Sequence, residues 1–567
     1  MKASEILDLK HAHSRVLRDQ RDDFVPDILR HYDFGQQRDE LLASLAENLD
    51  EGRWRPQKAM AMDIPKADFT VRPCMCPAIE DRIVYQAVAD CLLPHFESEE
   101  CVCSHKPNPV SSRTMFKQGV AQWERFQEEI ERLAHEYEFM LETDLVAYFE
   151  HVLHERLLRR MDDVFAGLDR SVLNLCKDLL GELLRWWANN RKWGIPQVLD
   201  PSSLLGEFYL DEVDKIMLRQ GLEYRRYVDD FRVFGHSDLE ARVALRQLIR
   251  ELRRMGLYVS AKKTHIYRRE DVLEQLDAGR QEMKDIEAAF DSKNQQLIEA
   301  CVPTLVSFFE KTLKRLDGNE PFSDRHFRFC IYRFALLTVL DPSTAGVHDK
   351  VMQEVLSRLR DMPHATSLFV DYLSCFPECE RAQDAAIDFL NSEDNIYEWQ
   401  EMLLLELLIR MDLTERNKKR VKKLGQRVLK EGKHPLCGAK AFILLGKNGD
   451  YADRAEIKEQ YFDEDSLVTK RGILVGLQEL PPDQRRYFYR NCKGHADEID
   501  RTIDYLSALH TPMYHFFSPP EPERVVEILV PTEVIPVEVG VAEPVPLEEA
   551  VEEEVPWEVE ELEEWYY

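Results

Sequence analysis

The stretch LEYRRYVDDFRVFG at residues 222–235 decides the fold, because two runs of aromatic and β-branched residues flank a pair of aspartates. Alternating apolar positions, among them Phe231 and Val233, predict two short strands joined through an acidic tip at Asp229 and Asp230. An unpaired charge buried in such a setting is costly, so a cation must face these carboxylates. Nearby arginines could supply it, which is the purely structural alternative: Arg225, Arg226 and Arg232.

A second stretch, EFMLETDLVAYFEHV at 138–152, predicts a buried strand that ends at Asp144 and is followed by a helix. Two carboxylates carried by different strands to one edge of a sheet form an oxygen-rich site of the kind that suits Mg²⁺. The chemistry is therefore expected in the α+β part of the chain.

These stretches resemble the reverse transcriptases, whose motifs occur here in the same order. YVDD at 227–230 resembles the turn of the palm, and DLVAYF at 144–149 resembles the D-x4-F/Y motif of the preceding palm strand. Three further segments resemble the nucleotide-binding, downstream and fingers motifs of that family: GIPQ (194–197) with SSLL (202–205), LYVSAKKT (257–264), and IPK (64–66) with RP (72–73).

The resemblance implies a right-hand fingers and palm domain over residues 61–270. Asp144 and Asp229, together with Asp230, would hold two Mg²⁺ ions, with Mn²⁺ as a substitute, and catalyse nucleotidyl transfer. Lys263 would give a proton or a positive charge to the pyrophosphate that leaves.

The resemblance also implies a nucleotide site. Lys66 and Arg72 would contact the triphosphate, and Gln197 would lie close to the nucleotide. Phe149 would stand against the sugar and leave no space for a 2′-hydroxyl, so deoxynucleotides should be preferred. The plainer alternative makes the cations ordinary surface residues and Phe149 part of the core.

One position departs from the family pattern. The motif usually reads P-Q-G, whereas here Gln197 is followed by Val198. A residue with a Cβ restricts the backbone where template and nucleotide approach closely, so we expect unusual use of the template.

Outside the palm the sequence predicts helices. Residues 1–60 form a helical segment, and amphipathic patterns over 275–515 predict an all-α domain, either a helical-repeat array or an irregular bundle. The tail, 518–567, holds 16 Glu against a single basic residue and carries −15 of the net charge of −30. With its many prolines it is expected to be an extended, solvated segment that mimics nucleic acid, binds a basic partner or merely keeps the chain soluble.

A palm followed by helices, without the ribonuclease H or maturase signatures of other members, resembles the bacterial abortive-infection and anti-phage defence-associated reverse transcriptases. EDRIVYQAVAD (80–90) and RYVDDFRVFG (226–235) are similar to that group. The resemblance implies defence by DNA synthesis, either copied from a noncoding RNA or untemplated and primed from a tyrosine such as Tyr566 or Tyr567. A homo-oligomer or a partner defence protein stays open.

A basic groove is expected near the far side of the palm, where phosphate contacts would hold a duplex. The alternative is a solvated helix face. The residues concerned are Arg242, Arg246, Arg250, Arg253, Arg254, Lys262 and Lys263.

Two rival functions remain. RNCKGH at 490–495 resembles the R-N-x-x-x-H motif of helical ribonucleases, with Arg490 and His495 acting on an RNA phosphate. The chain could also be a non-catalytic helical scaffold that senses a phage component. The cysteine pairs Cys74/Cys76 and Cys101/Cys103 fit zinc poorly, so free thiols, a cytoplasmic location and no membrane span are expected.

Overall fold

The computed structural model describes residues 2–20, 23–108, 114–188, 191–277, 280–292, 294–318, 323–340 and 345–514. They form two compact units. The first contains the described residues up to 277 with 356–370 and 376–514, and the second contains those between 280 and 355 with 371–375. The acidic tail, with Tyr566 and Tyr567, lies outside the described residues.

An antiparallel sheet of four strands, in the order β4-β5-β3-β6, forms the centre of the palm in the first unit. It consists of β3 (Phe139–Asp144), β4 (Glu223–Tyr227), β5 (Asp230–Gly235) and β6 (His265–Arg268). The alternation of β-branched and aromatic residues gives the sheet two apolar faces. One face, with Leu141 and Phe231, belongs to the main core, and the other packs Met140 and Phe234 with Phe126 and Ile130 of the helix beneath it.

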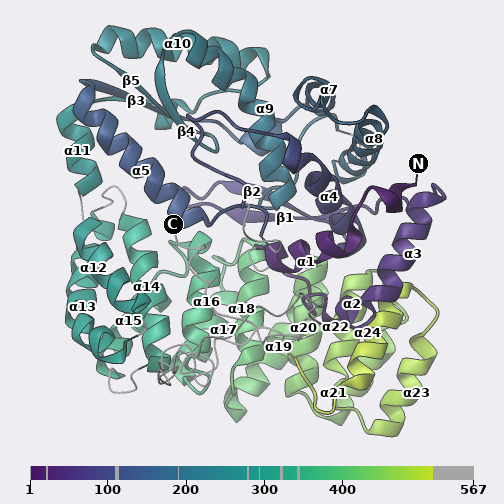
Figure 1. Ribbon diagram of the computed structural model, residues 1–567. Coiled ribbons are helices and arrows are strands. Elements are labelled where there is room, and N and C mark those ends of the chain that lie inside the picture. Colours follow the sequence, from purple (N-terminus) through teal and green to yellow (C-terminus); the bar gives the residue numbers. More distant parts are fainter. Residues whose placement is uncertain are drawn as a thin grey trace, which may run out of the picture. The chain divides into compact units, whose positions relative to one another are not determined.

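Helices cover both faces of this sheet (Figure 1). α10 (Asp238–Arg254) and α9 (Asp200–Arg219) contact one face, and α5 (Gly119–Glu136) contacts the other. The remaining helices before residue 278 are α1 (Leu9–Asp19), α2 (Tyr32–Gln36), α3 (Arg38–Asp50), α4 (Ile79–Leu92), α6 (Tyr148–His151), α7 (His154–Val164), α8 (Arg170–Trp187) and α11 (Arg269–Asp277).

A separate antiparallel hairpin is formed by β1 (Met60–Pro65) and β2 (Val71–Cys76). Its turn carries Lys66, and Arg72 lies opposite Ile64 in the register. This is the segment in which the fingers motifs were expected.

The helices after residue 376 stack in the first unit as an array. α18 contacts α20, α20 contacts α22, and α22 contacts α24, while the odd-numbered helices pack against this row (Figure 1). Small residues permit the close stacking, since a Cβ on Gly446 would overlap the carbonyl of Gly476. The helices are α17 (Glu380–Leu390), α18 (Glu398–Arg410), α19 (Glu415–Glu431), α20 (Pro435–Asn448), α21 (Tyr451–Gln460), α22 (Leu467–Gly476), α23 (Pro482–Cys492) and α24 (Asp497–Ala508).

The second unit is helical and includes α12 (Arg280–Asp291), α13 (Gln295–Asp317), α14 (Ser323–Leu340) and most of α15 (Ala345–Ser357). α13 packs against α12 and α14, with Phe308 and Phe309 buried between them. The chain passes between the units within α15 and α16 (Thr366–Ser374).

The predicted fold class, an α+β domain followed by helices, is confirmed. Among the described residues, no strand follows Arg268. No helix among them is long and apolar enough to cross a membrane. The predicted domain boundaries stay predictions, and the compact units divide the helical region differently, because the row from α18 to α24 joins the unit that contains the palm.

Candidate active site

The two central palm strands carry carboxylates to the same end of the sheet. β3 and β5 pair antiparallel, with Asp144 directly opposite Asp230. Asp229 precedes β5, and its backbone carbonyl accepts a hydrogen bond from the N–H of Leu145 at 3.3 Å. Residues far apart in sequence are thereby brought together, as the sequence predicts.

The carboxylates of Asp144 and Asp229 interact electrostatically. Burial raises the pKa of Asp229 to about 7, and the neighbouring Asp144 carboxylate adds to the shift. Like charges held together in a poorly solvated place disfavour ionisation, and this accounts for the raised pKa of Asp229.

Asp230 is held differently. Its carboxylate is paired with Arg232, which also lies 2.8 Å from Glu142. Burial raises the pKa of Asp230 to about 6, with Arg232 opposing the shift and Glu142 adding to it. The cation offered by the purely structural alternative is therefore present for Asp230, in the form of Arg232.

Lys263 forms an ion pair with Asp144. It comes from the turn after Ser260, whose N–H donates to the Asp144 carbonyl at 2.7 Å. Partial burial opposes protonation, but the contact with Asp144 dominates and raises the pKa of Lys263. A cation thus already faces the carboxylate on which the sequence places most of the chemistry.

The carboxylate pair fits a divalent cation. Asp144 Oδ1 is buried and accepts no hydrogen bond from the part of the chain that the structure describes. No group of three or more His, Cys, Asp and Glu side chains among the described residues is arranged to hold a metal ion. Asp230 pairs with Arg232, and Asp144 Oδ2 pairs with Lys263. The carboxylate of Asp229 and the Oδ1 atom of Asp144 are left to bind a cation, and Mg²⁺ is commonly held by one or two carboxylates together with substrate phosphates.

Phe149 lies just beyond the carboxylates, next to Tyr148. Its ring is half-buried and packs 5.1 Å from that of Tyr148, centroid to centroid. Gly206 of α9 faces both rings, since a Cβ there would lie 3.3 Å from an edge carbon of each. The Tyr148 hydroxyl donates to the Gly206 carbonyl at 2.7 Å, which ties the aromatic pair to α9.

Gln197 belongs to a segment that runs beside Phe149. The N–H of Ile195 donates to the Phe149 carbonyl at 2.9 Å, and Gln197 Nε2 lies 3.4 Å from Glu150 Oε1. Val198, which stands where the family has glycine, has a φ of +76°. This left-handed conformation strains the backbone of a β-branched residue.

The hairpin residues lie apart from this group. Lys66 is half-buried in the hairpin turn, and the Arg72 guanidinium stacks over the Phe24 ring at 5.5 Å. Lys262 contributes to the lowered pKa of Asp68, after hydrogen bonds from Thr70, so the hairpin turn faces the loop that carries Lys263.

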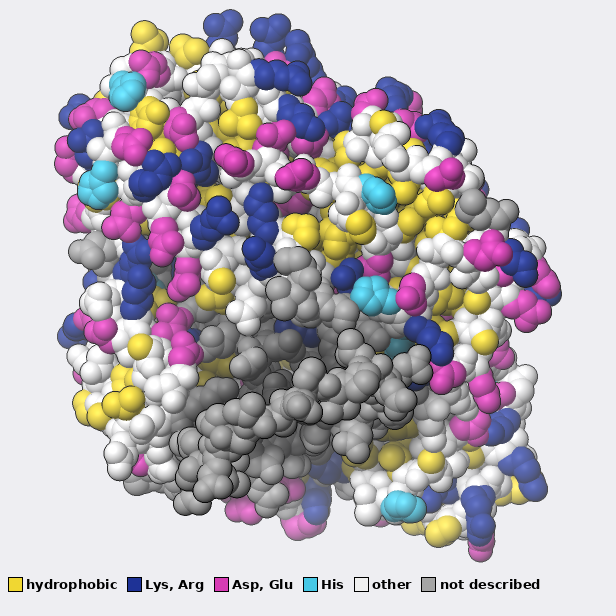
Figure 2. Space-filling model, in the orientation of Figure 1, with side chains coloured by type: hydrophobic (Ala, Val, Ile, Leu, Met, Phe, Trp, Pro, Cys, Tyr) yellow, Lys and Arg dark blue, Asp and Glu magenta, His cyan; other side chains and the backbone are white. Residues whose placement is uncertain are grey.

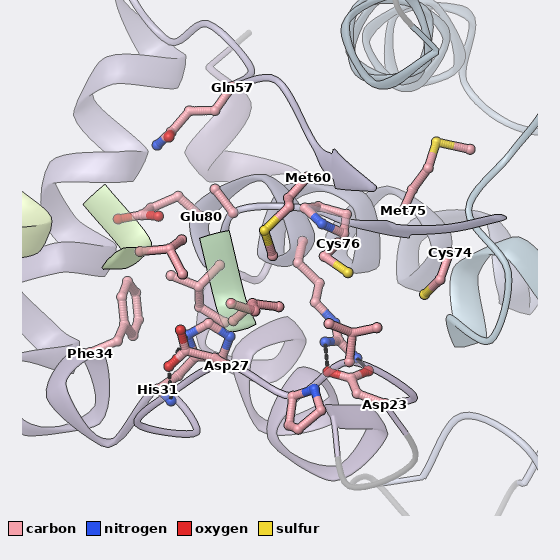
Figure 3. Close-up of a pocket in the computed structure, with 18 of the residues that line it drawn as sticks. Asp23, Asp27, His31, Phe34, Gln57, Met60, Cys74, Met75, Cys76 and Glu80 are labelled. Atoms are coloured by element: carbon pink, nitrogen blue, oxygen red, sulfur yellow. Dashed lines mark hydrogen bonds and ion pairs between the residues drawn. The ribbon is translucent and has the colours of Figure 1, made fainter. Parts of the chain in front are cut away.

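A pocket opens beside the hairpin (Figure 3). In Figure 3, Asp27 and Phe34 of the N-terminal segment lie across from Met60 and Cys76 of the hairpin. Gln197 also lines the pocket, but Asp144, Asp229 and Asp230 do not. Two arginines in its wall are neutralised by acids, Arg82 by Asp19 and Asp23 and Arg471 by Asp27, Asp33 and Glu498.

The basic groove takes the form of a helix face. Lys and Arg side chains gather over α10 in Figure 2. Arg242 pairs with Asp238 and Arg254 with Glu251, whereas Arg246, Arg250 and Arg253 are exposed, and no ion pair to them is found among the described residues. Both alternatives of the sequence analysis, a nucleic-acid contact and a solvated face, remain compatible with this arrangement.

The ribonuclease-like motif is broken by the end of a helix. α23 ends at Cys492, between Arg490 and His495, and Gly494 has a φ of +84°. Arg490 stacks on Tyr487 and His495 on Tyr461. The cysteines Cys74, Cys76, Cys101 and Cys103 are free thiols.

Sequence reasoning missed a buried network beneath the YVDD turn. The sequence offers Arg226 as a partner for the adjacent aspartates, whereas in the structure it forms ion pairs with Glu207 and Asp214 of α9. The sequence signal for this network is a pair of acidic residues, Glu207 and Asp214, seven positions apart in a largely apolar helix, because buried acids require a cationic partner.

Residues 64–296 match a family model described as reverse transcriptase (RNA-dependent DNA polymerase). This part of the chain is therefore a reverse transcriptase domain, which makes the chain an enzyme of the RNA-directed DNA polymerase class. The family uses divalent metal ions, nucleotides and a nucleic-acid template.

Other comparisons add little. No curated protein matches the chain. Among solved structures, telomerase from Candida albicans in complex with a TWJ fragment of telomeric RNA is similar over 70% of this chain and 68% of that chain, with 11% identity and a TM-score of 0.29.

Proposed function

We propose that this chain polymerises deoxynucleotides by two-metal nucleotidyl transfer and acts in bacterial anti-phage defence. The observation that carries the catalytic part is the convergence of the Asp144 and Asp229 carboxylates, with a pKa of Asp229 raised to about 7 and a buried Asp144 oxygen that lacks a donor. Such a pair gains most from a divalent cation, since the cation removes the repulsion that burial strengthens.

Asp144 and Asp229 would hold the Mg²⁺ ions, which lower the charge on the phosphates and activate the primer hydroxyl. Asp230, paired with Arg232, would complete the acidic environment without being a main ligand. Lys263 would move from Asp144 to the phosphates once a cation neutralises that carboxylate, and it could then protonate the leaving pyrophosphate.

The nucleotide would lie between Phe149 and the hairpin. Phe149 would exclude a 2′-hydroxyl, because Gly206 and Tyr148 keep its ring from retreating toward α9. Gln197 would approach the base or sugar from the segment beside it, and Lys66 and Arg72 would bind the triphosphate. For Arg72 this requires the guanidinium to leave its stack on Phe24.

The defence role is supported by the sequence resemblance and by the helical region that follows the palm. Synthesis would be copied from a noncoding RNA or would start without a template from a tyrosine. The exposed arginines of α10, Arg246, Arg250 and Arg253, would serve as phosphate contacts for the nucleic acid.

The experiment is incorporation of labelled deoxynucleotides by the purified full-length chain in Mg²⁺, with copurifying RNA intact or removed by nuclease. Product in either arm supports the polymerase, and its dependence on RNA separates templated from untemplated synthesis. No product in any arm, with folded protein, would contradict it. Ribonuclease activity that survives Asp229→Ala but is lost in His495→Ala would instead favour the rival function.

A further inference from the structure

Val228 lies at the tip of the catalytic turn, between Tyr227 and Asp229, with a φ of +54°. A β-branched residue in this left-handed region is strained and persists only where the surrounding structure holds it. Both polar groups of its backbone are held by side chains. The N–H donates to Ser104 Oγ at 2.8 Å, and the carbonyl accepts from Arg226 Nη1 at 2.7 Å.

Arg226 is itself fixed from below. Its Nε and Nη2 donate to both oxygens of Asp214, at 2.9 and 2.7 Å, and Nη2 lies 2.9 Å from Glu207 Oε2. Arg226 and Asp214 are each 1% exposed and Glu207 is 3% exposed. A bidentate guanidinium held in this way has one orientation, so its remaining donor is aimed at the Val228 carbonyl.

Ser104 is fixed by the same helix. Its hydroxyl donates to Glu207 Oε1 at 2.6 Å, which leaves the oxygen lone pairs for the Val228 N–H. His105 Nδ1 lies 2.8 Å from the same Glu207 oxygen. Glu207 therefore orients both side chains that grip Val228.

The contact between Glu207 and Arg226 is ionic. Although burial opposes it, Arg226 lowers the pKa of Glu207 to about 2. Burial also opposes protonation of Arg226, but its two acids raise the pKa of the guanidinium well above the usual value. Burial raises the pKa of Asp214, and Arg226 opposes that shift.

We propose that Ser104 and Arg226 are positioning residues. Held in place by Glu207 and Asp214 of α9, they fix the Val228 backbone so that the Asp229 carboxylate stays close to that of Asp144. The inference deepens the proposed function and rests on it where catalysis is concerned. Its geometric part, the position of the carboxylate pair, can be tested without polymerisation.

The test compares Ser104→Ala with a matched control in the full-length chain. Ser104→Ala removes the acceptor for Val228 without removing a charge. Thr502→Val removes another fully buried hydroxyl, which accepts from Arg471 and donates to Asp33, in the helical region. Binding of Mn²⁺ is measured by the electron paramagnetic resonance of the free ion, together with thermal unfolding and deoxynucleotide incorporation.

We expect Ser104→Ala to weaken Mn²⁺ binding about tenfold and to slow incorporation about tenfold or more, because a small misplacement of a reacting group is costly. Thr502→Val should lower the melting temperature about as much as Ser104→Ala does, but it should leave Mn²⁺ binding unchanged. Arg226→Lys, which keeps a charge beside Asp214 but has no fork to reach Val228, should act like Ser104→Ala if it folds.

The outcomes separate the two claims. If the wild type incorporates nucleotides but Ser104→Ala matches Thr502→Val in Mn²⁺ binding and in incorporation, the positioning role is wrong and the polymerase stands. If no variant incorporates nucleotides but Ser104→Ala alone weakens Mn²⁺ binding, the positioning role stands and the proposed function fails. A wild type that binds no Mn²⁺ contradicts the positioning role as well.

Discussion

Lys263 pairs with Asp144 across the end of the palm sheet, where a buried oxygen of the same carboxylate has no donor among the described residues. The lysine thus neutralises the charge of Asp144, whereas no such cation in the described part of the chain neutralises Asp229 and its ionisation is disfavoured. A divalent cation would compete with Lys263 for Asp144 and release the ammonium toward the phosphates. The stability of the chain should therefore depend on both pH and metal.

The first prediction concerns pH. Asp229 has a pKa of about 7 in the folded chain, against about 3.9 when unfolded. Folding then takes up a proton between these values, so the stability of metal-free protein should fall as pH rises from about 4 to about 7. Asp229→Asn removes the carboxyl group whose ionisation destabilises the folded chain. It should stabilise the metal-free chain at pH 8 by about 1–2 kcal/mol, measured by urea unfolding in EDTA.

The control is Asp162→Asn, which changes a carboxylate in an ion pair with Lys177 on the surface of the palm. Because the hydrogen bond and charge of Lys177 lower the pKa of Asp162, this variant should leave the pH dependence of unfolding between about pH 4 and about pH 7 as in the wild type. Adding Mn²⁺ at pH 8 should stabilise the wild type and not Asp229→Asn. Identical pH profiles for the wild type and Asp229→Asn would count against the buried pair.

The second prediction concerns the sugar. Phe149→Ala opens the space beside the nucleotide, so incorporation of ribonucleotides relative to deoxynucleotides should rise by about two orders of magnitude, as for loss of a steric block worth a few kcal/mol. Tyr148→Phe keeps both rings and loses only the hydroxyl that donates to Gly206. It should leave sugar selection unchanged, and a Phe149→Ala enzyme that still rejects ribonucleotides would make Phe149 a core residue.

The third prediction concerns Val198, whose φ of +76° suits glycine. Val198→Gly should stabilise the chain by about 1 kcal/mol, because the relief of strain exceeds the entropy that glycine adds to the unfolded state. Val198→Ala retains the Cβ and should bring no such gain. Urea unfolding of both variants tests the prediction. A destabilised glycine variant would mean that the packing of the valine side chain contributes more to stability than the backbone strain costs.

The fourth prediction concerns the wall of the pocket. Arg471 is 3% exposed and faces Asp27, Asp33 and Glu498. Arg471→Met would leave these acids buried without a cation and should cost about 3–5 kcal/mol. Arg486→Met, which removes an exposed arginine paired with Asp483, should cost less than about 1 kcal/mol. Equal losses in the two variants would contradict the assigned role of Arg471.

The alternation of apolar residues along the sequence correctly predicted the central strands of the palm. The strand that ends at Asp144 and the two strands around Asp229 follow from alternating apolar residues, and they occur as predicted. The family order of motifs then predicted which carboxylates would meet. At Val198 the departure from the motif marks a position with a positive φ, which glycine adopts more readily than valine.

Contacts between segments that are distant in the sequence could not be predicted from the sequence. Nothing in the sequence around Arg226 indicates that Ser104 and Glu207 share its environment, because these contacts depend on how α9 crosses the turn. The pairing of Asp230 with Arg232 was foreseen only as an alternative. The division of the helical region into two compact units also depends on packing that amphipathic patterns do not encode.

The most direct measurement is the rate of deoxynucleotide incorporation in Mg²⁺ by the wild type, Asp144→Asn, Asp229→Asn and the control Asp162→Asn. If Asp144 and Asp229 hold the metal ions, each of their variants should lose at least about three orders of magnitude in rate while remaining folded, and the control should retain the wild-type rate. Wild-type rates in either Asp144→Asn or Asp229→Asn would contradict the account.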